Sequence, residues 1–185
     1  FTPTANTEDA SNTLSLATSY TDSASNEGSV ATTANYEVDT LVPSVNSFTL
    51  SDTALKAGEN ATVKLVFSEA VASFSSSADI TVDNGTLATM TSTDNITWSG
   101  TLTPTVNTEV ASNTLSLATS YTDTAGNAGP ASTTENYEVE TLAPTVKSFT
   151  LSDTALKAGI LLYTSYAADV LPPLAPVVRT FVQQY

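Results

Sequence analysis

Hydrophobic and polar residues alternate in short segments along this chain. In the segment 61–67, Val63, Leu65 and Phe67 are separated by residues that include Lys64, a pattern typical of a half-buried β-strand. Turn-forming residues separate this segment from others like it. Between residues 45 and 140 the patterns predict seven strands, at 45–51, 61–67, two within 80–90, 96–104, 113–121 and 133–140. No segment has a convincing helical period, so the pattern predicts an all-β chain.

Two details of the pattern predict local structure. Asn84-Gly85 lies between two β-rich runs, and this pair favours a two-residue type I′ hairpin turn. In the segment 68–79, which crosses between strands, Val71 and Phe74 are expected to cover the core. Trp98 is the best candidate for its anchor, and the remaining predicted core residues include Val63, Leu65, Phe67, Leu115, Leu117 and Tyr137.

A long internal repeat sets the domain organisation. Residues 1–58 align with residues 102–159 at a constant offset of 101, and 44 of the 58 aligned positions are identical. This period is too long for a solenoid turn and matches a sandwich domain. Seven short strands in about 100 residues are typical of an immunoglobulin-like sandwich. The sequence therefore predicts an all-β, Ig-like antiparallel β-sandwich in tandem repeats.

Two proline-containing stretches, 39–43 and 140–144, mark the predicted domain boundaries. Residues 1–38 are then the C-terminal half of one repeat, and residues 39–139 form a complete repeat. Residues 140–159 provide the first strand of a third repeat, and residues 160–185 match nothing in the repeat. The half repeat is expected to leave sheet edges and one core face open, because it holds only the last strands of its unit.

Composition excludes several functional classes. The chain has 19 acidic and 5 basic residues, a formal net charge of −14, which disfavours nucleic acid and anionic membranes as partners. It contains no cysteine and no histidine, so disulfides, zinc–thiolate sites and imidazole bases are excluded. The longest apolar run is too short to insert in a bilayer. The acidic pair Asp79 and Asp83 resembles glycosidase carboxylates only weakly, and we predict no enzyme activity.

Acidic and amide side chains from three separate segments are expected to meet at one end of the complete repeat. These are Asp39 before the first strand, Glu69 after the second, and Asp123 with Asn127 in a glycine-containing loop. Such oxygen ligands suit Ca²⁺. An ion that also bound Asp39 would bridge two repeats. The alternative is that Asp123 and Asn127 only hydrogen-bond their own backbone in an Asx turn.

Several motifs resemble a known family. The run from Pro43 to Val71, the segment DITVDNGTL at 79–87, the Trp98 strand and the loop YTDTAGNAG strongly resemble the bacterial Ig-like repeats of giant surface adhesins and biofilm-associated proteins. The resemblance covers residues 1–159. It implies a non-catalytic extender on the bacterial cell surface or outside the cell, supporting adhesion or biofilm formation, with neighbouring repeats as partners. It also implies Ca²⁺ ligation by Asp39, Glu69, Asp123 and Asn127, with Asp79 as a weaker addition.

One position departs from that family. Ser25 stands where the family's loop has glycine, and this puts the geometry of the first loop copy in doubt.

An alternative function is a glycan- or protein-binding module. That alternative has little support, because Tyr20, Tyr121 and Trp98 are all expected in cores rather than on an exposed binding surface.

The tail requires a separate interpretation. The segment ILLYTSYAADV at 160–170 resembles the conceptual translation of a transposon-type sequencing adapter. We therefore expect residues 160–185 to be non-native. The alternative is a native C-terminal segment, rich in proline after residue 171 and disordered. Sequencing genomic DNA across the codon for Gly159 distinguishes the two.

Overall fold

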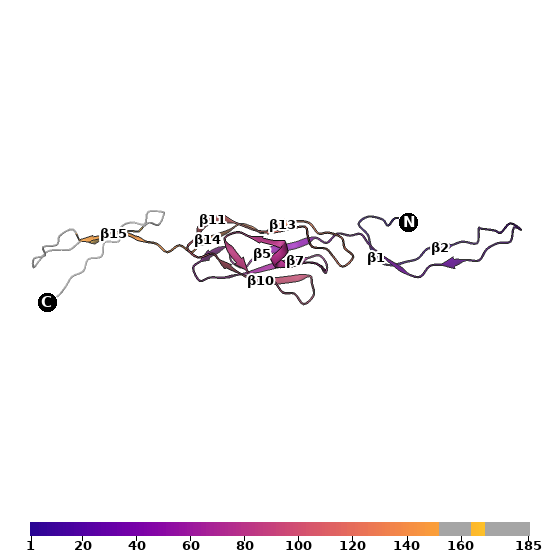
Figure 1. Ribbon diagram of the computed structural model, residues 1–185, viewed down its shortest axis with the longest axis horizontal. Helices are drawn as coiled ribbons and strands as arrows, with labels where there is room; N and C mark the ends of the chain where they lie inside the picture. The colour runs from indigo at the N-terminus through magenta and orange to yellow at the C-terminus, as the bar shows by residue number, and fades with distance from the viewer. Residues whose placement is uncertain (152–163, 169–185) are drawn as a thin grey trace, which may run out of the picture. The chain divides into compact units, whose positions relative to one another are not determined.

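A computed structural model describes residues 1–151 and 164–168 of the chain, and it confirms the all-β class (Figure 1). Among these residues only four form a helix, α1 (Ser76–Asp79). Within the described residues, no helix is long and apolar enough to cross a membrane. The chain divides into two units, Phe1–Thr141 and Leu142–Tyr185.

The first layer of the complete repeat is a four-stranded antiparallel sheet. Across the sheet its strands are β5 (Val45–Leu50), β7 (Ala61–Phe67), β10 (Thr97–Pro104) and β9 (Gly85–Leu87). Within it Trp98 pairs with Leu65, and Phe48 pairs with Leu65 from the other side. Alternate residues of β7 are buried, as the sequence predicts.

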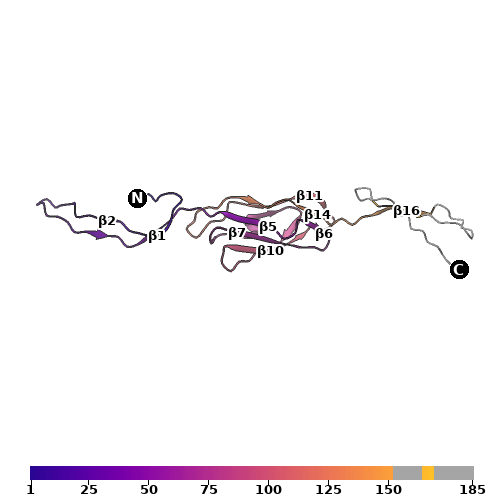
Figure 2. The same cartoon turned by 180° about the vertical axis from the view of Figure 1, so that it is seen from behind.

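The second layer consists of two three-stranded sheets. One is formed by β11 (Glu109–Asn113), β14 (Tyr137–Glu140) and β6 (Ala54–Lys56), and the other by β13 (Ser132–Thr133), β12 (Leu115–Leu117) and β8 (Ile80–Val82). β11 pairs with β14, and β12 pairs with β13 and β8. Figures 1 and 2 show β10 and β11 on opposite sides of this domain. The two layers have the strand grouping of an Ig-like sandwich.

One apolar core lies between the layers. Val63, Leu65 and Phe67 contribute from the first layer, and Leu115, Leu117 and the two tyrosines Tyr121 and Tyr137 from the second, and all are buried. The expected cover from the crossing segment is present, since Val71 and Phe74 are also buried. Trp98 does not anchor the core as predicted. It is only partly buried and packs edge-on against Phe74 at the rim, while the largest fully buried side chains are tyrosine and phenylalanine.

The predicted hairpin at Asn84-Gly85 is wrong. β8 belongs to the second layer and β9 to the first, so this connection passes between the sheets. Only Asn84 of the pair has positive φ, at 46°, whereas a type I′ turn requires positive φ at both residues. A Cβ at Gly85 would lie 2.8 Å from Leu102 Cδ1. A side chain at this position would have to displace Leu102, so glycine favours the close packing at the crossing between layers.

The predicted half repeat, residues 1–38, forms a long hairpin whose last strand extends to Asp39. Its strands are β1 (Glu8–Asn12), β2 (Ser15–Leu16), β3 (Ala31–Thr32) and β4 (Tyr36–Asp39), with β1 paired to β4 and β2 to β3. Three of its apolar residues, Leu14, Leu16 and Tyr20, are exposed, although their equivalents Leu115, Leu117 and Tyr121 are buried.

The second unit contains β15 (Val146–Leu151), which is paired with β16 (Thr164–Ala168). β15 lies one repeat length of 101 residues after β5 in the sequence, and the third repeat itself stays a prediction. The remaining residues 152–163 and 169–185 lie outside the described part of the chain. The hypothesis of a non-native tail at residues 160–185 therefore stays a prediction, as do the proposed domain boundaries.

Candidate metal centre

Three carboxylates meet at one end of the complete repeat. Asp39 ends β4, Glu69 follows β7, and Asp123 lies in the loop between β12 and β13. Their ligand atoms all lie within 4.8 Å of one another. Asp39 and Glu69 are partly buried, and Asp123 is 1% exposed. The structure thus brings together three of the five residues that the sequence analysis named as ligands; below we call them the carboxylate group.

Main-chain hydrogen bonds hold the three segments against one another. The N–H of Ser68 donates to the carbonyl of Ser44, in the segment that follows Asp39, at 2.9 Å. The N–H of Ala72 donates to the carbonyl of Thr122, next to Asp123, at 2.8 Å. The stretch that carries Glu69 is therefore fixed on one side to the linker and on the other to the loop.

Asp123 organises its own loop. Its Oδ1 accepts hydrogen bonds from the main-chain N–H groups of Ala125, Gly126 and Asn127 at 2.8–2.9 Å. Burial would raise the pKa of this carboxyl, but these bonds and the Asn127 side chain outweigh it and hold the pKa below its ordinary value. The Asx turn considered from the sequence is thus present. It satisfies Oδ1, while Oδ2 accepts a hydrogen bond from the Asn127 side chain.

Asn127 contacts the carboxylate group through its amide nitrogen. Nδ2 lies 2.8 Å from Asp123 Oδ2, 3.4 Å from Asp39 Oδ1, 3.3 Å from the Asp39 carbonyl and 3.2 Å from the Leu41 carbonyl. An amide NH₂ has only two hydrogens to donate. Four oxygens therefore surround the Asn127 amide nitrogen, which can donate to only two of them at a time. The oxygens left without a donor concentrate negative potential at this point.

Among these carboxyl groups, Glu69 is the one whose pKa is raised. Burial raises the pKa of its carboxyl above the ordinary value. The negative charges of Asp123, Asp39 and Glu8 act in the same direction. Ionising Glu69 therefore costs more free energy than ionising an isolated glutamate.

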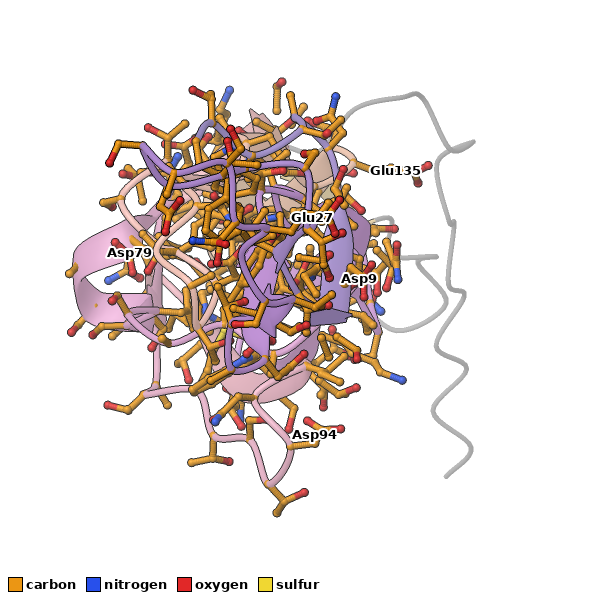
Figure 3. The ribbon with its side chains drawn as sticks, turned by 90° about the vertical axis from the view of Figure 1, so that its right-hand side faces the viewer. Asp9, Glu27, Asp79, Asp94 and Glu135 are labelled. Carbon is orange, nitrogen blue, oxygen red and sulfur yellow. The ribbon has the colours of Figure 1, made fainter. Side chains whose placement is uncertain are left out.

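Asp79 does not belong to the carboxylate group. It ends the helical turn α1 and is buried, and its Oδ2 accepts a hydrogen bond from the N–H of Ser75 at 2.7 Å. Its Oδ1 accepts from the hydroxyl of Ser120. Figure 3 labels Asp79 beside this turn, while Asp94 lies on the loop at the bottom of the view. Asp79 has a complete structural role in closing the turn.

Asp83 has structural partners as well. Its Oδ2 accepts hydrogen bonds from the N–H and the hydroxyl of Thr114, at 3.2 and 3.3 Å. Its carbonyl accepts from the hydroxyl of Tyr137. These contacts connect the segment that crosses between the layers to the second layer. Asp83, like Asp79, therefore has a structural role.

The first copy of the loop keeps the geometry despite its serine. Ser25 has a φ of 69°, and the equivalent Gly126 has a φ of 97°. Asp22 accepts from the N–H groups of Ala24 and Asn26 at 2.8 and 2.9 Å, as Asp123 does in its own loop. The doubt about this loop is therefore resolved: serine adopts the left-handed conformation, at a typical cost of about 1–2 kcal/mol.

The oxygen chemistry of the carboxylate group suits a hard cation. A calcium ion takes six to eight oxygens and accepts main-chain carbonyls beside carboxylates. The carbonyls of Asp39 and Leu41 were not identified by sequence reasoning, because any residue carries a carbonyl and only the fold directs it. Asn127 would offer its Oδ1 after a rotation of the amide, an exchange of two nearly isosteric ends.

Comparison with known proteins gives one match. A family model described as bacterial Ig-like domain matches residues 39–139, which is more than half of the chain and covers the strands of the sandwich except for the last residue of β14. The comparison with curated proteins and the comparison with solved structures each found no match.

Proposed function

Because the chain belongs to the bacterial Ig-like domain family, we propose that it is an extender segment of a secreted or cell-surface adhesin, with repeat joints that are rigidified by Ca²⁺. The bacterial Ig-like domain is a non-enzymatic structural module. In this proposal the segment supports cell adhesion or biofilm formation by spacing other domains. The observation that carries it is the carboxylate group, whose members come from the linker and from the following repeat.

The linker is connected on both sides. Thr40 donates its N–H to the carbonyl of Thr7 at 2.8 Å, and its hydroxyl to the carbonyl of Thr4 at 2.7 Å. Both partners belong to the half repeat. The neighbouring Asp39 lies against Asn127 of the complete repeat. A cation held at this point would therefore act on the residue that joins the two repeats.

Asp39, Glu69 and Asp123 would hold the ion through their carboxylates, and Asn127 would add its amide oxygen. Bound Ca²⁺ would supply positive charge that offsets the repulsion between Glu69 and the neighbouring carboxylates. The residues themselves provide the rest: the Asx turn fixes Asp123, and the main-chain bonds of Ser68 and Ala72 fix the stretch that contains Glu69. The linker would then lose freedom relative to the repeat.

The test is unfolding of the full chain with Ca²⁺ and with a chelator, followed by the fluorescence of Trp98, the only tryptophan. At a free ion concentration one hundred times the dissociation constant, we expect a gain of about 2.7 kcal/mol in the free energy of unfolding. Glu69→Gln should abolish this gain. Asp22→Asn, in the equivalent loop of the half repeat, is the matched control and should retain it.

An unchanged unfolding curve of the native chain on addition of Ca²⁺ would remove the metal from the proposal. So would a Glu69→Gln variant that responds like the native chain. The structural role as a spacer is tested separately, by deleting whole repeats from the parent surface protein and measuring adhesion.

A further inference from the structure

The pair Asn84-Gly85 does not form the hairpin turn that its sequence favours, and its chemistry has a different consequence. Asn84 is exposed and adopts the left-handed conformation, with a φ of 46°. Of the asparagines in the sequence, it alone is followed by glycine. The main-chain nitrogen of a following glycine can reach the side-chain amide carbon of asparagine without hindrance from a Cβ. Asn84 is therefore the asparagine of this chain that is most open to attack by its own main chain.

The attacking nitrogen, that of Gly85, lies outside the hydrogen-bond ladder of the sheet. Gly85 is paired with Pro104, and the N–H of Thr105 donates to the carbonyl of Asn84 at 2.9 Å. Hydrogen-bonded and non-hydrogen-bonded pairs alternate along an antiparallel ladder, so the N–H of Gly85 points away from β10. The sheet ends on that side, because β9 is its edge strand. This nitrogen can therefore react without breaking a ladder hydrogen bond.

The side-chain amide of Asn84 is the donor to a buried residue of the second layer. Its Nδ2 donates to Oδ1 of Asn113 at 2.6 Å. Asn113 is 1% exposed, and its own Nδ2 donates to the carbonyls of Val110 and Tyr137 at 2.9 and 3.0 Å. These bonds span the bulge between β11 and β14. Asn84 thus completes the hydrogen bonding of a buried amide from the segment that crosses between the layers.

We propose that Asn84 is a site of spontaneous deamidation in the folded chain. The Gly85 nitrogen forms a bond to Cγ of Asn84 and gives up its proton, and the Cγ–Nδ2 bond breaks to release ammonia. Water then opens the resulting succinimide ring at either of its carbonyls, which gives aspartate or isoaspartate at position 84. Water is the only co-reactant that the sequence of steps needs.

Both products place a carboxylate where the Asn84 amide was. An ionised carboxylate has no hydrogen to donate, so the buried Oδ1 of Asn113 loses its donor. A buried acceptor without a donor destabilises the folded state. Isoaspartate in addition lengthens the main chain at the crossing between the layers. The modification therefore weakens the connection between the two layers as the protein ages.

The first experiment incubates the full folded chain at mildly alkaline pH and follows each asparagine by peptide mapping and mass spectrometry. Asn107 is the internal control, because it is also exposed and left-handed, with a φ of 54°, but is followed by threonine. Asn84 should be converted at least about tenfold faster than Asn107, since the branched Cβ of threonine hinders the attacking nitrogen and glycine has none. Conversion of Asn84 in the folded chain no faster than that of Asn107 overturns the proposal. Fast conversion of Asn84 in urea alone would have the same meaning, because the fold would then protect it.

The second experiment tests the consequence with Asn84→Asp, which carries one of the two products from the start. Urea unfolding followed by Trp98 fluorescence should give an equilibrium constant for folding at least about fivefold lower than that of the native chain. Asn107→Asp is the matched control and should unfold like the native chain. An Asn84→Asp variant as stable as the native chain would overturn the role of Asn84 as the donor that Asn113 needs.

Discussion

The segments 12–22 and 113–123 have identical sequences, which first diverge in the loop that follows. They adopt the same local structure in very different surroundings. Both belong to a hairpin with the same pairing register and the same bulge. In the first copy Leu14, Leu16 and Tyr20 are 48%, 52% and 45% exposed, whereas the equivalent residues of the second copy are 0–2% exposed. Local sequence is therefore enough to form the hairpin, and only the opposing sheet buries it.

The polar contacts of the two hairpins are also the same. Tyr20 donates its hydroxyl to the carbonyl of Ser29 at 2.9 Å, and Tyr121 to that of Pro130 at 2.8 Å. Only the environment of the ring differs, and in the second copy burial raises the pKa of Tyr121 to about 12. Hydrogen bonds within the hairpin thus specify its shape, while burial provides the apolar free energy that distinguishes the two copies.

The largest expected effect comes from truncating the same leucine in each copy. Leu115→Ala should lower the free energy of unfolding of the complete repeat by about 2–5 kcal/mol, because it leaves a cavity in a closed core. Leu14→Ala should change it by less than about 0.5 kcal/mol, since that side chain is half exposed and lies outside this core. Urea unfolding followed by Trp98 fluorescence measures both. Equal losses would show that the two hairpins share one cooperative core.

A smaller effect is expected at two equivalent glycines, where an added Cβ would clash with a tyrosine ring. A Cβ at Gly129 would lie 2.1 Å from the ring of Tyr121, and a Cβ at Gly28 would lie 2.0 Å from the ring of Tyr20. Tyr121 is enclosed, so Gly129→Ala should destabilise the complete repeat by about 1–3 kcal/mol. The ring of Tyr20 can move into solvent, and Gly28→Ala should leave the Trp98 transition unchanged.

Thermal unfolding of the two alanine variants measures this difference. If Gly129→Ala were as stable as the native chain, the tyrosine ring of the complete repeat would have to be as free to move as that of the half repeat. That result would contradict the idea that the opposing sheet immobilises the ring.

Most strands were predictable from sequence, although β6 and most of β11 were not, and the assignment of strands to sheets was predicted only in part. Alternation of apolar residues locates β7 because one of its faces is buried. The Asn84-Gly85 pair suggested a hairpin because turn chemistry is local, but the partner of Gly85 is Pro104, which lies far along the chain. β6 was missed because a three-residue strand has little periodicity, and its parallel pairing with β14 has no sequence signal.

The candidate metal centre was predictable to a similar degree. Carboxylates can be recognised by residue type, and the Ig-like topology placed Asp39, Glu69 and Asp123 at one end. The roles of Asp79 and Asn127 could not be recognised in this way. Whether a buried oxygen or amide nitrogen faces the carboxylate group depends on hydrogen bonds such as that from Ser120 to Asp79, and these form only in the folded chain.

The smallest expected effect separates the two acidic loops. Hydrogen bonds lower the pKa of both Asp22 and Asp123, but only Asp123 is faced by Glu69. The folded-state pKa of Glu69 is raised, so its ionised form costs stability above that pKa, and the cost disappears as the pH falls through it and the carboxyl takes up a proton. In chelator at neutral pH, Glu69→Gln should therefore be slightly more stable than the native chain, by less than about 1 kcal/mol because the group is partly solvated.

Urea unfolding of the native chain and of Glu69→Gln over a series of pH values measures this difference. It should shrink toward zero as the pH falls below the folded-state pKa of Glu69, and Asp22→Asn should show no comparable gain at neutral pH. A Glu69→Gln variant that is less stable than the native chain in chelator would mean that Glu69 makes favourable contacts without a cation. In that case the carboxylate group would stabilise the metal-free repeat, and the repulsion that Ca²⁺ is proposed to relieve would not exist.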